Sequence, residues 1–260
     1  MILNDFDCKK YYDVIEKNIH LFKRDYKSSR VKLFRFKYMI KVYQSSIGYL
    51  GFRKNVYNDK IKILDIGFGD GELILLLSKM GFYVNGIDIS KGKKDRLKDL
   101  LKINNLNANL AVGKVHEVGK IYNNSEFDCI FLSEVLEHLK KPEEAIKEIF
   151  KILKKDGKLI VTVPFEEKIK YYVCTNCYKL TPASGHFNSY SISSLKKILE
   201  GSGFSIDLGR SIVNKLFHKK VINNLISFPV LSFVIFIDKL LNFIIKKPSF
   251  ILILSRKYST

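Results

Sequence analysis

The sequence has 260 residues and a formal net charge of +19, so one large domain, or one domain with an appendage, is expected. Residues 1–60 hold 14 Lys/Arg against 6 Asp/Glu, and residues 210–260 hold 9 against 1. These basic flanks favour an anionic partner (nucleic acid, an anionic membrane surface or a phosphorylated substrate), although a lysine-rich composition would give the same pattern. Residues 1–10 lack the apolar run of a secretory signal, and four Cys without a pairing pattern favour the cytoplasm over a secreted disulfide scaffold.

Residues 1–55 are predicted to form a helical lid that precedes the main domain, residues 56–260. Apolar side chains recur at helical spacing near its start, at Tyr11, Tyr12, Ile15, Ile19 and Phe22. In residues 23–41, eight Lys/Arg are interleaved with aromatic side chains. This segment is interpreted as a lid over the ligand site, with contact to membrane headgroups or RNA as the alternatives.

Glycine follows the first predicted strand, residues 61–65, at every second position: Gly67, Gly69 and Gly71. A helix is expected from Glu72. Glycines let the backbone approach a ligand closely, and the start of a helix offers unpaired N–H groups. A dinucleotide site requires Gly-x-Gly-x-x-Gly, and Glu72 stands where that pattern has its third glycine; a phosphate loop is absent.

Asp88 ends the next predicted strand, residues 82–88, about 20 residues beyond the glycines. At this place α/β nucleotide sites carry an acid that accepts hydrogen bonds from ribose hydroxyls. A turn or cap residue is the alternative reading. The neighbouring Ile89 would offer an apolar face to an adenine ring.

The pattern Asp65-x-Gly67-x-Gly69-x-Gly71 resembles motif I of the class I S-adenosylmethionine-dependent methyltransferases. This resemblance covers roughly residues 55–210 and the last strand. It implies S-adenosyl-L-methionine as the cofactor, with the three glycines shaping the turn and Asp65 orienting the turn and the methionine moiety. Methyl transfer then requires alignment of the acceptor and exclusion of water.

A second run, Glu134-x-Leu-Glu-His138-Leu, follows the strand predicted over residues 127–133 and resembles the corresponding motif of small-molecule methyltransferases. The resemblance implies that Ser133 and Glu134 line the methyl-donor end of the site. His138 is the candidate general base if a hydroxyl group is methylated. The alternative is a supporting histidine that holds Glu134 or the loop.

Helices and strands alternate through the middle of the chain, which predicts an α/β fold, a three-layer αβα Rossmann-like sandwich. The resemblance implies a seven-stranded sheet of order 3-2-1-4-5-7-6, with strand 7 antiparallel. Family members often carry an Asp after the third strand, where this chain has Lys114. The remaining elements are expected as helices 91–104, 142–155 and 195–200 and strands 108–113, 158–163, 204–212 and 249–254.

Cys174 and Cys177 are separated by two residues, in a stretch predicted to be irregular. Two such Cys can share a tetrahedral zinc ion with His186 as a third ligand, so a structural zinc is one interpretation. Two plain thiols are equally compatible with the spacing, and redox chemistry is a weaker alternative. Because Gly-His at this place also resembles methyltransferases without the Cys pair, His186 is alternatively expected to face the substrate.

An insertion is predicted between strands 6 and 7, at about residues 213–247. Residues 221–237 are uncharged for 17 positions, which is short for a membrane span. We therefore expect amphipathic helices that act as a substrate cap or lie in a membrane interface. The predicted apolar stripe comprises Val230, Val234, Ile237, Leu241 and Ile244, and the predicted polar side comprises Asp238, Asn242 and Lys246.

The combined interpretation is an S-adenosylmethionine-dependent methyltransferase acting on a small-molecule, saccharide or lipid-linked acceptor, with O-methylation resting on His138 alone. The alternatives are a non-catalytic S-adenosylmethionine-binding module and an NAD(P)-dependent oxidoreductase. A cytoplasmic protein with peripheral contact to an anionic membrane is expected, and nucleic acid is not, because no recognition module is present. Sequence patterns do not determine the oligomeric state or the acceptor.

Overall fold

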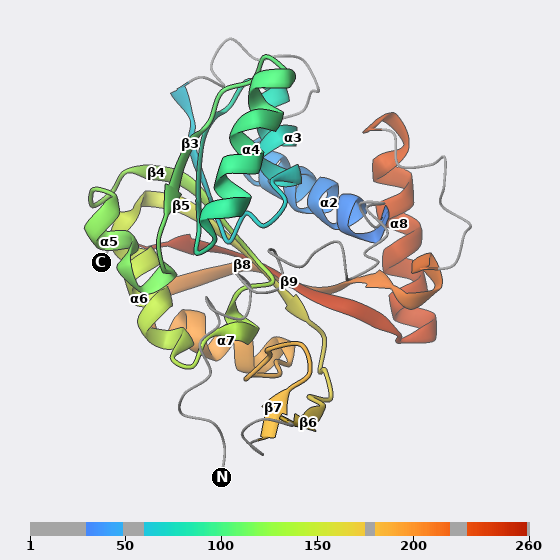
Figure 1. Ribbon diagram of the computed structural model, residues 1–260. Coiled ribbons are helices and arrows are strands. Elements are labelled where there is room, and N and C mark those ends of the chain that lie inside the picture. Colours follow the sequence, from blue (N-terminus) through green and yellow to red (C-terminus); the bar gives the residue numbers. More distant parts are fainter. Residues whose placement is uncertain (1–29, 49–59, 175–179, 219–227, 259–260) are drawn as a thin grey trace.

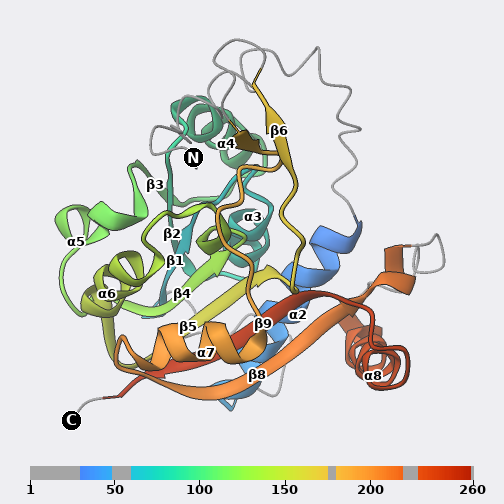
Figure 2. The same ribbon diagram turned by 90° about the horizontal axis from the view of Figure 1, so that it is seen from below.

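The structure is a computed structural model, and it describes residues 30–48, 60–174, 180–218 and 228–258. A seven-stranded sheet of order β3-β2-β1-β4-β5-β9-β8 forms the middle layer, and helices cover both of its faces (Figure 1, Figure 2). Strands β3, β2, β1, β4 and β5 pair in parallel, and β9 is antiparallel to both β5 and β8. The predicted fold and strand order are confirmed, since β8 and β9 are the predicted strands 6 and 7.

The parallel strands place their carboxyl ends at one edge of the sheet, where α/β folds bind ligands. Asp65 of β1 stands opposite Gly86 of β2 and Phe131 of β4. The strands of the sheet are β1 Lys62–Ile66, β2 Tyr83–Asp88, β3 Asn109–Val112, β4 Phe127–Ser133, β5 Leu153–Pro164, β8 Phe204–Asn214 and β9 Pro248–Lys257.

Two hydrophobic cores flank the sheet, because alternate strand residues point to opposite faces. In β5, Ile160 belongs to one core, and Leu159 and Val161 belong to the other. The first core includes side chains of α2 Arg30–Ser46, α3 Glu72–Lys79, α4 Lys91–Ile103 and α8 Phe228–Ile245. The second includes side chains of η2 Val115–Glu117, α5 Val118–Ile121, η3 Leu136–His138, α6 Pro142–Ile152 and α7 Ile192–Glu200.

The helix predicted over residues 142–155 ends at Ile152, and β5 begins at Leu153. Lys154 was assigned to the helix because a basic residue suits a helix C-terminus. Instead its ammonium group lies 2.8 Å from the Asp128 carboxylate on β4. Leu153 pairs with Phe127 and is fully buried, so burial of an apolar residue on the sheet determines where the helix ends.

The stretch after β5, predicted to be irregular, contains a small antiparallel pair of strands, β6 Tyr171–Val173 and β7 Leu180–Pro182. Cys174 directly follows β6 and is partly exposed, whereas Cys177 lies outside the described residues. Helix α7 begins after Ser191, which caps it, because the Ser191 hydroxyl accepts a hydrogen bond from the Ser194 N–H at 3.1 Å.

The aromatic side chains of α2 belong to the core and not to a surface. Phe34, Phe36, Tyr38 and Tyr43 are each at most 5% exposed. The helix is buried on more than one side, since Arg35 and Gln44 are also at most 6% exposed. The earlier positions that indicated a helix, from Tyr11 to Phe22, lie outside the described residues.

Helix α8 faces the core differently from the prediction. Asp238, expected on the solvent side, is fully buried, and its carboxylate accepts hydrogen bonds from the backbone N–H groups of Val213 at 2.9 Å and Asn214 at 2.7 Å. These bonds hold the end of β8, after which η4 Lys215–His218 follows. None of the described helices is long and apolar enough to cross a bilayer.

Candidate functional site

The glycine turn after β1 has the backbone form that its sequence predicts. Gly67, Gly69 and Gly71 have φ values of +74°, +56° and +83°, a region that residues with a side chain rarely adopt. A Cβ atom on Gly71 would approach a Leu97 methyl carbon to 2.3 Å, and one on Gly67 would approach a Val135 methyl carbon to 2.5 Å. Gly69 has open space above its Cα, with no atom nearer than 3.9 Å. Two glycines therefore serve close packing, and the middle one lies where a ligand could approach.

Asp88 connects the end of β2 to the glycine turn. Its Oδ2 atom accepts a hydrogen bond from the Gly69 N–H at 2.9 Å, and its Oδ1 atom accepts one from the Ser90 N–H, also at 2.9 Å. Ser90 in turn caps α4 by accepting from the Lys93 N–H. Asp88 therefore stabilises the glycine turn. Each of its carboxylate oxygens also keeps a further lone pair that can accept a hydrogen bond from a ribose hydroxyl. Ile89 beside it is partly exposed.

Acidic and basic groups surround the turn. Asp65 is 2% exposed, and burial, followed by the nearby Asp88 charge, raises its pKa to about 8. Asp70 forms ion pairs with Arg96 of α4 and Lys32 of α2, and Lys32 also lies 2.6 Å from the Glu72 carboxylate. Burial raises the pKa of Asp70, but the two cations outweigh this effect and lower the pKa below its ordinary value. The N-terminal part of α2 is therefore bound to the glycine turn by charge.

Glu134 stands at the carboxyl end of β4 in an unusual backbone conformation, with φ +56°. Its N–H donates to the Thr162 carbonyl at 2.9 Å, and the preceding Ser133 hydroxyl lies 2.9 Å from the Thr162 hydroxyl. Its carboxylate forms an ion pair of 3.2 Å with Arg35 of α2. Burial raises the pKa of Glu134, and Arg35 opposes this effect. Arg35 itself lies over the Phe250 ring, 4.4 Å from its centroid.

The segment that leads into α7 folds back over η3. The Glu137 carbonyl accepts hydrogen bonds from the N–H groups of Phe187 at 2.7 Å and Asn188 at 3.2 Å, and the Tyr190 hydroxyl donates to the Leu136 carbonyl at 3.2 Å. The Glu137 carboxylate is 1% exposed, and neither of its oxygens has a hydrogen-bond partner among the described residues. Burial raises its pKa well above the ordinary range, which favours the protonated form.

His138 and His186 come together although they are far apart in the sequence. Their rings meet edge to face with centroids 4.5 Å apart. The Nδ1 atom of His138 lies 3.0 Å from the Gly185 carbonyl, and that of His186 contacts the Glu167 carboxylate. Because a carbonyl only accepts, Nδ1 of His138 carries the proton and Nε2 carries the lone pair in the neutral ring. Burial, with a contribution from His186, lowers the pKa of His138 to about 4.

Three possible metal-ligand atoms converge here, one each from Glu137, His138 and His186, all within 4.8 Å of one another. Cys174 does not belong to this group. Of the predicted zinc ligands Cys174, Cys177 and His186, Cys177 lies outside the described residues. Within the described chain, the surroundings of His186 are thus acidic and imidazole groups.

Sequence patterns indicated the glycine turn, Asp88 and the segment Ser133 to His138, which all lie at the carboxyl ends of β1, β2 and β4. They did not indicate Arg35, Glu137 or Glu167. Arg35 is one of several basic residues in α2, and only tertiary packing reveals its carboxylate partner. Glu137 appeared within the recognised run, but nothing in its spacing indicates that its carboxylate is buried.

Comparison with known proteins identifies the family. A family model described as a methyltransferase domain matches residues 36–208. The chain belongs to the S-adenosylmethionine-dependent methyltransferases. Its fold is also that of solved members: an S-adenosylmethionine-dependent methyltransferase from Archaeoglobus fulgidus has a TM-score of 0.57 at 21% identity, covering 92% of this chain and 99% of its own.

A second solved relative is the 1,6-didemethyltoxoflavin-N1-methyltransferase of Burkholderia thailandensis, whose structure holds 1,6-didemethyltoxoflavin and S-adenosylhomocysteine. It has a TM-score of 0.62 at 12% identity and covers 99% of this methyltransferase and 94% of its own chain. Among curated proteins, the ubiquinone biosynthesis O-methyltransferase of Pelagibacter ubique is 34% identical over 113 residues, 44% of this chain and 45% of the relative. A UDP-N-acetylmuramoylalanine–D-glutamate ligase of Clostridium tetani is 28% identical over 191 residues, 70% of this chain and 38% of the ligase. The matches thus span less than half of each of these two curated relatives.

Proposed function

We propose that this methyltransferase transfers a methyl group from S-adenosylmethionine to an oxygen of a small-molecule, saccharide or lipid-linked acceptor. The observation that carries the proposal is the 2.9 Å hydrogen bond from the Gly69 N–H to the Asp88 carboxylate, which joins the ends of β1 and β2. The family-model match over residues 36–208 supports it. In this proposal the glycine turn and Asp65 contact the methionine moiety, Asp88 the ribose, Ile89 the adenine, and Ser133 the methyl end. The printed name of the Pelagibacter relative, an O-methyltransferase, supports oxygen as the methylated atom.

Calorimetric titration with S-adenosylhomocysteine, and with NAD in a parallel cell, tests the cofactor. We expect binding in the micromolar range for S-adenosylhomocysteine and none for NAD, because Glu72 interrupts the dinucleotide glycine pattern. Binding of NAD alone would mean an oxidoreductase and overturn the proposal. Tight S-adenosylhomocysteine binding without transfer to any acceptor in a lipid and metabolite extract would favour the non-catalytic module.

His138 is proposed as the general base, and Glu134 as its acidic neighbour at the methyl end. The donor is already an activated sulfonium, so the protein has to align the acceptor and remove a proton. With its pKa lowered to about 4, His138 is neutral at physiological pH, so its Nε2 lone pair can accept a proton, but it is a weaker base than an ordinary histidine. Direct contact with His186 keeps the imidazole in place.

Replacement of His138 by Ala is expected to slow methyl transfer about 10²-fold while leaving S-adenosylhomocysteine affinity near wild type. Because the His138 ring stays neutral to low pH, the wild-type rate should stay level as the pH falls from 7 toward about 5. With an unperturbed histidine as the base, the rate would already fall near pH 6.5, where half of that histidine is protonated. Transfer of labelled methyl groups into an extract measures the rate of the variant and the pH dependence of the wild-type rate. His116→Ala is the matched control, since this imidazole contacts the Lys141 carbonyl and not the His138–His186 pair. A rate unchanged by His138→Ala would reduce His138 to a supporting role.

We further infer a peripheral contact with an anionic membrane, through α8. Its outward side is apolar: Phe233, Phe236, Phe243 and Ile244 are between 59% and 79% exposed with respect to the described residues. An exposed apolar helix face in a basic part of the chain is typical of helices that lie in a membrane interface. A lipid-linked acceptor is compatible with such a contact.

A structural zinc ion on Cys174, Cys177 and His186 stays a prediction. The two-residue spacing of the Cys pair, next to the paired strands β6 and β7, supports it. The contact of His186 with Glu167 is compatible with it as well, because ligating imidazoles commonly donate their other N–H to a carboxylate.

A further inference from the structure

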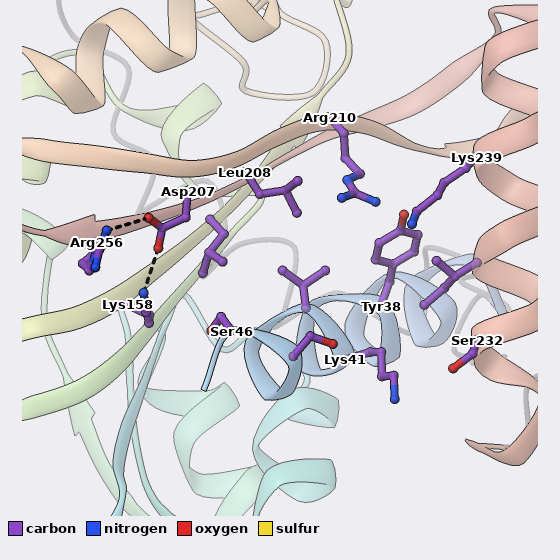
Figure 3. A pocket seen from close by; sticks show the side chains of 14 residues that line it. Tyr38, Lys41, Ser46, Lys158, Asp207, Leu208, Arg210, Ser232, Lys239 and Arg256 are labelled. Atoms are coloured by element: carbon purple, nitrogen blue, oxygen red, sulfur yellow. Dashed lines mark hydrogen bonds and ion pairs between the residues drawn. The ribbon is translucent and has the colours of Figure 1, made fainter. Parts of the chain in front are cut away.

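A basic cavity lies on the sheet face between α2, β8 and α8, apart from the glycine turn. Its volume is about 650 Å³, and Figure 3 shows the side chains that line it. At one end, Asp207 is bound to Lys158 at 2.7 Å and to Arg256 at 3.3 Å, so that acid is already engaged. The other end is formed by cationic and hydroxyl groups.

Arg210 of β8 and Lys239 of α8 point toward each other at that second end (Figure 3). Within the described residues, no ion pair joins either of them to a carboxylate. Asp238, the neighbouring acid, is committed to the backbone of Val213 and Asn214. Two converging cations repel each other, and burial together with the Arg210 charge lowers the pKa of Lys239. An anion between them would remove this repulsion.

Tyr38 of α2 adds a neutral donor to the same end. Its side chain is fully buried beside the Arg210 guanidinium, which can only donate, and no acceptor for the proton of its hydroxyl is present among the described residues. Burial raises the pKa of Tyr38 to about 12, so the hydroxyl keeps its proton at physiological pH. Figure 3 shows it directed toward Lys239 and Arg210. A buried donor without an acceptor costs stability, and a phosphate oxygen would satisfy it once the side chains that cover this hydroxyl move aside.

The cavity adjoins the apolar side of α8. Ser232, Ile235 and Lys239 line the cavity, while Phe233, Phe236 and Phe243 are exposed on the outward side of the same helix. A helix that lies in the interface with its apolar side about 5–10 Å deep brings its neighbouring cations to the level of lipid phosphates. This continuity of charge and apolar surface favours a lipid over a free phosphate as the source of the anion.

We propose that this cavity binds the phosphate headgroup of an anionic phospholipid through Arg210, Lys239 and the Tyr38 hydroxyl, an inference that rests on the proposed membrane contact of α8. The headgroup would bridge α2 and β8 to α8. Because α2 also carries Arg35 and Lys32, which pair with acids of the candidate site, the bound lipid would stabilise the helix that contacts that site.

The experiment is a vesicle co-sedimentation series with the full-length chain, using phosphatidylcholine vesicles with and without phosphatidylglycerol. The test variant is Arg210→Met/Lys239→Met, and the matched control, Lys98→Met/Lys102→Met, removes two exposed charges from α4, which lies away from α8 in both views (Figure 1, Figure 2). Since each cation near an anionic surface contributes about 1 kcal/mol, or about fivefold, the test variant should bind phosphatidylglycerol vesicles about 25-fold more weakly. The control should lose much less, and both variants should keep wild-type S-adenosylhomocysteine affinity.

The other outcomes distinguish the headgroup site from the membrane contact of α8. Wild-type vesicle binding that the test variant retains would overturn the headgroup site but leave the membrane contact of α8 standing. Absence of wild-type vesicle binding, with calorimetric binding of inorganic phosphate that the test variant loses, would replace the lipid by a free phosphate and overturn both the lipid assignment and the membrane contact. Binding of neither vesicles nor phosphate would overturn both as well. Weaker vesicle binding by Phe236→Ser/Phe243→Ser, with phosphate binding unchanged, would support the division of roles between cavity and helix.

Discussion

Replacement of Asp88 by Ala is expected to weaken S-adenosylhomocysteine binding by about 1.5–3 kcal/mol, which corresponds to about 10- to 150-fold in affinity. Two losses combine in this variant. The ribose hydroxyls would lose a charged acceptor, and the N–H groups of Gly69 and Ser90 would lose theirs. Calorimetric titration measures the total. Asp99→Ala, which removes an exposed acid from α4, should leave the affinity within about twofold of wild type.

The two losses can be separated with Asp88→Asn. An amide of the same shape keeps one acceptor oxygen but presents N–H groups to the other donor, so the turn is only partly released. Amide hydrogen exchange at Gly69 reports on the turn, and calorimetry reports on the ligand. Weak binding with a protected Gly69 amide would assign Asp88 to direct ribose contact. Wild-type affinity in both variants would remove Asp88 from the site.

Replacement of Arg35 by Met is expected to lower the free energy of unfolding by about 2–3 kcal/mol, because it leaves the Glu134 carboxylate without its ion-pair partner. The expectation is below the 3–5 kcal/mol typical of fully buried pairs, since the Glu134 side chain is 23% exposed. Met keeps most of the apolar stem that lies over Phe250. Urea unfolding of Arg35→Met, Glu134→Gln and the double variant gives the coupling energy. A coupling energy near zero would show that the pair does not stabilise the fold.

The sign of the pH dependence follows from the Glu134 pKa. Burial raises this pKa above the ordinary value of 4.5, and Arg35 counteracts the rise. Without Arg35 the folded protein binds the Glu134 proton still more tightly than the unfolded chain does. Stability of the variant is therefore lost as pH rises from the unfolded pKa through the folded one, and is recovered at low pH. The deficit relative to wild type should be smaller at about pH 5 than at about pH 8.

The sequence indicated the sheet well, and there are physical reasons for this. Strands such as β4 are continuous apolar runs because both of their faces are covered, and this signal survives without any tertiary information. Glycine at positive φ and Ser191 at a helix start are local requirements. The end of α6 was misplaced because Lys154 suits a helix C-terminus equally well as an ion pair with Asp128 on the sheet.

For helix α8, the sequence pattern predicted the wrong buried side. Its apolar residues are so numerous that several stripes fit the helical period, and the one chosen placed Asp238 toward solvent. In the structure Asp238 is buried because two backbone N–H groups at the end of β8 require an acceptor. No pattern within α8 contains that information, since the donors belong to another segment of the chain.

By itself, then, the sequence determined the Rossmann-like sheet, the glycine turn and the positions of Asp65, Asp88, Ser133 and Glu134 at its edge, because these depend on local backbone demands and strand burial. Only the tertiary structure decided that Arg35 faces Glu134, that His138 meets His186, and that Arg210 and Lys239 converge beside Tyr38. Each of these is a long-range pairing of charged or polar groups. Such pairings follow from how helices pack on the sheet, and the distance along the chain between the partners leaves no periodic signal.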